Sequence, residues 1–152
     1  MSRWTQLSGA TALACVFSAS VGQADVSGQE VWADWKSYMQ DFGYTISGSE
    51  SRSGDTLTVT DLVMSINIPQ DDGTVELIMP ELSFTDQGDG TVLVKMPEQS
   101  MFKMQAESPK GDTANVSASI DATGMSTVVS GDPDDMTYSY TAASLVMSLD
   151  QF

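Results

Sequence analysis

Residues 70–81, QDDGTVELIMPE, recur at residues 87–98 as QGDGTVLVKMPE, with eight of the twelve positions identical. Each copy combines a Gly/Asp turn, a short run that alternates in polarity, and a final Met-Pro-Glu. The turn residues and the period of two predict a strand that follows a hairpin turn. Proline cannot donate to a ladder, so it marks a strand end or an edge. The repeat predicts two similar strands with the same turn chemistry, or a sheet that extends strand by strand.

The apolar residues of the two copies share one parity, which predicts that they lie on one face of the sheet. They are Val75, Leu77, Met79, Val92, Val94 and Met96. Their neighbours of opposite parity, such as Glu76 and Ile78, are mixed in polarity, as expected of a face partly open to water. The apolar face is expected either to form ordinary core under a helix or to line a groove for acyl chains.

Alternating segments continue on both sides of the repeat and are separated by Gly/Asp turns. They cover residues 45–51, 56–68, 75–84, 92–96, 100–107, 116–120, 125–129 and 137–149. This spacing predicts an antiparallel meander of about seven or eight strands. Apolar parity changes near Thr60-Asp61 and again near Ala142-Ala143. The first change implies a bulge, or a strand buried on both faces over part of its length.

A helix is predicted over residues 25–42. Ser27 and Glu30 have the spacing of a capping box, and Gly43 ends the segment. Its apolar positions recur at helical spacing, and we expect Trp32, Trp35 and Phe42 to pack the helix onto the sheet. The sequence therefore predicts an α+β fold over residues 25–152, with one N-terminal helix packed on a curved, mainly antiparallel β-meander. This domain is expected to be complete or to be the first part of a longer sheet.

Residues 1–24 are typical of a secretory signal peptide. Arg3 begins a positive region, residues 10–21 are apolar, and Gly22 and Ala24 provide small residues before a cut between Ala24 and Asp25. The apolar run is too short to span a bilayer as a helix, and no later segment is long and apolar enough. We expect a periplasmic or secreted protein. The alternative is a lipoprotein signal in which Cys15 carries the lipid.

The charge balance excludes several classes of function. The 152 residues include 6 Lys and Arg, 21 Asp and Glu, one Cys and no His, for a net charge of −15. Nucleic-acid binding needs clustered cations, so it is excluded. Histidine base catalysis, Cys/His zinc sites and an internal disulfide lack their residues. The acidic surface favours solubility, with a cation site or a basic partner as the alternative.

No motif assigns a catalytic, cofactor-binding or metal-binding residue. Ser100 and Lys103 match the S-x-x-K pattern of serine acyl-enzymes, but they lie in a strand-like run without the companion motifs. The carboxylate clusters coincide with turns and do not match a calcium loop. The ten methionines fit core positions or a deformable apolar groove. The sequence therefore predicts a protein that is not an enzyme and needs no cofactor.

The start of the predicted domain resembles a known family. Residues 29–35, QEVWADW, continue through Gly43-Tyr44 to residues 54–58, GDTLT. This pattern is similar to the N-terminal part of the bacterial domain of unknown function 2125 family, which is grouped with AsmA-like envelope proteins. The resemblance implies a long curved antiparallel sheet with an apolar channel and a role in lipid handling at the envelope. It implies no site residues, and this chain is shorter than the family members.

Two functions are expected from these observations. The first is a non-enzymatic periplasmic or envelope protein with a role in lipid contact or envelope maintenance. The alternative is a protein-interaction module that docks an envelope partner through its sheet edge or its acidic face. Either a lipid or an envelope protein is therefore the expected partner.

Overall fold

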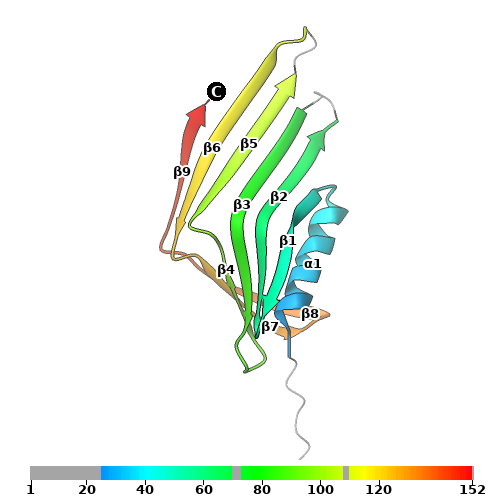
Figure 1. Cartoon of the computed structure of the whole chain (residues 1–152), viewed down its shortest axis with the longest axis vertical. Helices are drawn as coiled ribbons and strands as arrows, with labels where there is room; N and C mark the ends of the chain where they lie inside the picture. Colours follow the sequence, from blue (N-terminus) through cyan, green and yellow to red (C-terminus); the bar gives the residue numbers. More distant parts are fainter. Residues whose placement is uncertain (1–24, 70–72, 108–109, 152) are drawn as a thin grey trace, which may run out of the picture.

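The computed structural model describes residues 25–69, 73–107 and 110–151 and confirms the α+β class (Figure 1). One helix packs on a nine-stranded antiparallel sheet. The elements are α1 (Gly28–Asp41), β1 (Thr45–Ser53), β2 (Thr56–Ile68), β3 (Gly73–Asp86), β4 (Val92–Lys95), β5 (Gln99–Glu107), β6 (Thr113–Thr123), β7 (Ser126–Asp132), β8 (Asp135–Thr141) and β9 (Ser144–Gln151).

The nine strands occupy six antiparallel positions in the sheet, because three of these positions each hold two strands placed end to end. β1, β2 and β3 pair in sequence order, and β4 and β5 follow one another along the free edge of β3. β7 and β6 then pair with β4 and β5, and β8 and β9 pair with β7 and β6. The strand predicted over residues 137–149 is therefore two strands interrupted at Ala142-Ala143, which raises the count above the expected seven or eight.

The strands are bent or interrupted at neighbouring positions, and we call the line that joins these positions across the sheet the bend line. In β2 the bend is at Asp61, which has a positive φ of 51°, and the pairing of β1 with β2 shifts there by one residue. This confirms the bulge predicted from the parity change. Pro80 lies in the part of β3 between its partners β4 and β5, and Pro97 lies between β4 and β5 themselves. Both Met-Pro-Glu copies thus mark the bend line, and β2 and β3 bend near their middles (Figure 1).

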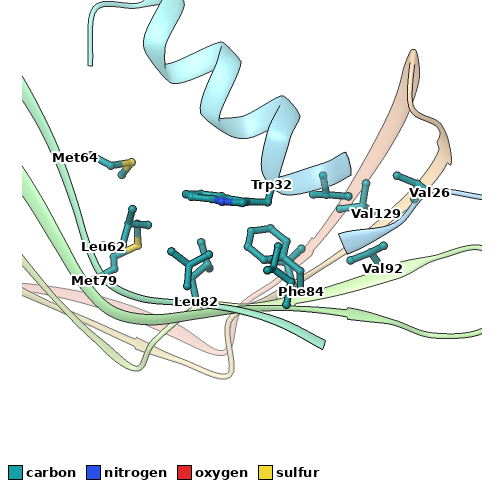
Figure 2. Close-up of a cluster of buried hydrophobic side chains, with 13 residues drawn as sticks. Val26, Trp32, Leu62, Met64, Met79, Leu82, Phe84, Val92 and Val129 are labelled. Atoms are coloured by element: carbon teal, nitrogen blue, oxygen red, sulfur yellow. The ribbon is translucent and has the colours of Figure 1, made fainter. Parts of the chain in front are cut away.

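The core lies between α1 and the half of the sheet formed by β4, β7 and the adjoining parts of β2 and β3 (Figure 2). Trp32 extends from α1 over the sheet beside Phe84, and Val92 and Val129 lie at one end of the cluster. The ring centroids of Trp32 and Phe84 are 5.6 Å apart, and those of Trp35 and Phe84 are 5.4 Å apart. Burial of these large side chains supplies the main stabilisation of the fold.

The N-terminal end and one side of α1 are fixed by polar contacts. The capping box is confirmed, because the Ser27 hydroxyl accepts from the Glu30 N–H and the Glu30 carboxylate accepts from the Ser27 N–H. On the side, Glu50 of β1 accepts from Lys36 Nζ at 2.7 Å and from Trp32 Nε1 at 2.8 Å. The hydrogen bonds from Lys36 and Trp32 hold the pKa of the Glu50 carboxyl below its usual value.

One prediction for the helix is wrong. Trp32 is buried and Trp35 is partly buried against the core, but Phe42 is 61% exposed and does not pack onto the sheet. Phe42 is the C-cap residue, one position beyond the last turn, and its ring lies 4.8 Å from that of the exposed Tyr38. Helical spacing places Phe42 on the apolar side of the helix. The sheet does not extend under this end of α1, so Phe42 stays exposed.

Thr127 on β7 is a defect in this core. Its side chain is fully buried, and its Oγ1 has no hydrogen-bond partner among the described residues. Valine has almost the same shape without the hydroxyl, so Thr127→Val is expected to stabilise the protein by about 1–2 kcal/mol. Urea unfolding measures this change, and Thr137→Val at an exposed position of β8 is the matched control. A destabilised Thr127→Val variant would show that the hydroxyl has a partner in solution.

Candidate functional site: an uncovered apolar face

The six apolar residues singled out in the repeat lie on the face of the sheet that carries α1, but they differ in burial. Val92 and Val94 are fully buried and Met79 is nearly so, and all three belong to the core cluster under α1. Leu77 and Met96 are partly buried and pack against that cluster. Val75 is half-buried and lies opposite Met104 of β5. The predicted face is therefore mostly core, and it continues past Val75 and Leu77 onto β5.

Beyond this margin the sheet has no helix over it. We call β5, β6 and β9 the open wing, because α1 packs against β1, β2, β3 and β4. Cross-strand pairs carry the helix-side face across the wing, since directly opposed residues point to the same side. Leu77 pairs with Phe102, Phe102 with Ala118, and Ala118 with Leu149.

The helix-side face of the open wing is almost entirely apolar. Its members, which we call the apolar face, are Phe102, Met104, Val116, Ala118, Ile120, Ala122, Leu145, Met147 and Leu149. None of them is charged. On β9 the side chains of Leu145, Met147 and Leu149 are 65%, 67% and 60% exposed. Large apolar side chains gathered and exposed in this way are typical of a binding surface.

The opposite face of the wing is mostly polar, with Met101 and Val146 as exposed apolar residues among its polar ones. Asp121 accepts from the Gln99 side chain at 3.0 Å, and Asp150 accepts from the Ser119 hydroxyl at 3.1 Å. Lys103 is also on this side, opposite Glu76 of β3. The wing is therefore amphipathic, with one face suited to water and the other suited to an apolar layer.

The free edge of the wing is β9. It pairs with β6 on one side, and among the described strands none pairs with its other side. Its residues 144–150 are all exposed. An unpaired edge presents backbone N–H and C=O groups that can accept another strand.

The structure does not bring the two residues of the S-x-x-K match together. Ser100 and Lys103 occupy opposite faces of β5, so the lysine cannot serve as base for the serine. In the described part of the chain, no group of three or more His, Cys, Asp or Glu residues is placed to hold a metal ion. The same ranges contain no helix long and apolar enough to cross a membrane.

The sequence contained a signal for the wing that the repeat did not reveal. Leu145, Met147 and Leu149 alternate with Val146, Ser148 and polar neighbours, so their shared face was predictable. What the pattern could not show is that α1 packs against β1, β2, β3 and β4 and leaves the face of the open wing uncovered.

The fold and site define an α+β protein with one curved sheet, half of which is covered by a helix. No family model matches the chain, and no curated protein and no solved structure matches it either. The resemblance to the domain of unknown function 2125 family therefore stays a prediction.

Proposed function

We propose that this chain is a non-enzymatic envelope protein, periplasmic or secreted, whose open wing contacts the acyl chains of lipids. The observation that carries the proposal is the apolar face, which is uncharged and strongly exposed on β9 while the opposite face of the same strands is mostly polar. Removing one large apolar side chain from water contributes about 1.5–3 kcal/mol. A ligand that covered several of these exposed side chains would therefore gain a large binding free energy.

The shape and composition of the face support an acyl chain as the occupant. A hydrocarbon chain needs a continuous apolar strip and no fixed hydrogen bonds, and successive cross-strand pairs provide such a strip. Met104 and Met147 are unbranched and adapt to chains of different shape. The apolar face, with these two adaptable methionines, thus fits a ligand class rather than one rigid ligand.

Binding of a neutral apolar dye, phenylnaphthylamine, tests the proposal, with oleic acid as competitor. The variant Met147→Gln places a neutral polar group on the apolar face, and Val146→Gln does the same on the polar face of the same strand, where Val146 is 51% exposed. We expect the first variant to weaken dye binding about tenfold and the second to leave it unchanged, because only the first removes apolar contact area. Both positions are exposed, so both variants should fold. Equal effects, or no dye binding by the unmodified protein, would contradict the proposal.

Export is the second part of this proposal. It is supported by the charge, apolar run and small residues of positions 1–24, which lie outside the described residues, and the expected mature N-terminus, Asp25, is exposed. N-terminal sequencing of the protein recovered from the periplasm or medium should begin at Asp25. A mature chain that begins with a lipid-modified Cys15 would contradict this cleavage site.

The open edge of β9 favours the alternative function, docking of an envelope protein by strand addition. The two functions differ in the hydrogen exchange of β9. A docked strand would protect the β9 amides that face away from β6, whereas an acyl chain on the apolar face would leave those amides exchanging. Hydrogen exchange of β9 is measured with and without oleic acid, and also in protein isolated together with a bound partner. Protection of the outward β9 amides only in the partner-bound sample favours strand addition.

A further inference from the structure

A hollow lies on the other side of the bend line from the open wing, between α1 and β8. Its volume is about 360 Å³, and it is lined by Asp34, Trp35, Tyr38, Met39, Tyr138 and Tyr140. The four helix residues lie on one side of α1, and the two tyrosines alternate along β8 and so share a face. The hollow is separate from the open wing, and the proposed lipid contact does not use it.

Aromatic rings make up most of the lining. The ring centroids of Trp35 and Tyr138 are 6.4 Å apart, and Tyr138 and Tyr140 are also 6.4 Å apart with nearly parallel planes. Tyr140 is 68% exposed and Tyr38 is 64% exposed, so both rings are accessible to a ligand. The rings therefore present accessible π surface around a concave space.

The charge at this hollow is negative. Asp34 is the only acidic or basic residue, apart from the tyrosines, among the described residues that line it, and its Oδ2 accepts from the Tyr138 hydroxyl at 3.1 Å. Burial and the contact with Asp34 raise the pKa of Tyr138, so its phenol stays neutral and acts as donor. The nearby cation Lys36 is bound to Glu50 and lies over the Trp32 ring, so it does not neutralise Asp34.

We infer that this hollow binds a small organic cation that carries a methylated ammonium group. The faces of aromatic rings attract such cations, and a ring of aromatic side chains is the arrangement that recognises quaternary ammonium. The Asp34 carboxylate supplies the matching charge. The volume lies in the range of small-ligand sites.

Other ligand classes fit this lining less well. A sugar needs many hydrogen-bonding groups around its hydroxyls, and here Asp34 and the tyrosine hydroxyls are the main polar groups. A divalent metal ion needs several oxygen ligands, and Asp34 is the only carboxylate in the lining. An acyl chain would leave that carboxylate without a charge partner.

Titration with choline, followed by NMR of the Trp35 indole and Tyr140 ring in the full mature chain, tests the inference. We expect saturable shifts at both rings, and binding at least about tenfold weaker for the neutral isostere dimethylbutanol, which lacks the charge. Tyr140→Leu should weaken choline binding by a similar factor. Phe42→Leu changes another exposed ring outside the hollow and should leave it unchanged.

Equal binding of choline and the isostere, equal effects of Tyr140→Leu and Phe42→Leu, or an absence of saturable shifts would each overturn the inference.

Vesicles of phosphatidylcholine identify the source of the cation. Vesicle binding that choline competes away indicates a lipid headgroup, and choline binding without vesicle binding indicates a free cation. Dye binding by the apolar face should be unaffected by Tyr140→Leu, so failure here is distinguishable from failure of the proposed lipid contact.

Discussion

Replacement of Phe84 by alanine is expected to lower the free energy of unfolding by about 3–5 kcal/mol. Phe84 has no exposed surface, and its ring contacts the rings of both Trp32 and Trp35. A Cβ added at Gly28 would lie 2.9 Å from the Phe84 Cβ, so the start of α1 is already as close to β3 as it can be. The helix cannot move inward to fill the space, and the substitution leaves a cavity. Urea unfolding followed by tryptophan fluorescence measures the loss.

Phe42→Ala is the matched control, because it removes the same atoms from an exposed position at the end of α1. Its ring contacts Tyr38, so we expect a loss of less than about 1 kcal/mol. Comparable losses at Phe84 and Phe42 would mean that the helix is not docked on β3 as described.

The second large effect is expected at the bend line. Leu62→Ala should cost about 2–5 kcal/mol, whereas Val63→Ala, one residue further along β2, should cost at most about 1 kcal/mol. Leu62 is fully buried opposite Met79, and Val63 is half-buried on the other face opposite Ile78. Urea unfolding of the two variants gives the comparison directly.

This pair of variants tests the bulge itself. If β2 alternated regularly from Leu57 and Val59, then Val63 would point to the core and Leu62 would point away from it. The left-handed Asp61 reverses that order. A larger loss at Val63 than at Leu62 would therefore remove the bulge from the description of the fold.

Local patterns were sufficient to predict much of the fold. The capping box at Ser27, the stop at Gly43 and the strands with their Gly/Asp turns depend on neighbouring residues, which the sequence displays directly. The parity change at Asp61 was also visible. The matching change in β3, between Met79 and Leu82, coincides with the repeated Met-Pro-Glu, whose meaning depends on the partner strands on each side of Pro80.

Long-range arrangement explains what local patterns missed. The end-to-end placement of β4 and β5 follows from pairing along β3, and the exposure of Phe42 follows from the extent of the sheet beneath α1. The aromatic hollow joins Asp34 and Tyr138, which are 104 positions apart in the chain. Alternation identifies the two faces of a strand, but it does not identify what lies on them.

The bend line divides the sheet into two halves that are stabilised by different interactions. On the helix side the segments share a buried cluster of large apolar side chains, whereas β9 is held mainly by its hydrogen bonds to β6. Elements with few buried contacts open at low free energy without global unfolding. Local opening should therefore start at β9 and progress inward to β6 and β5. An apolar ligand that bound the open wing only while β9 is paired with β6 would suppress this local opening. Ligand occupancy and the pairing of β9 would then be two measures of the same equilibrium.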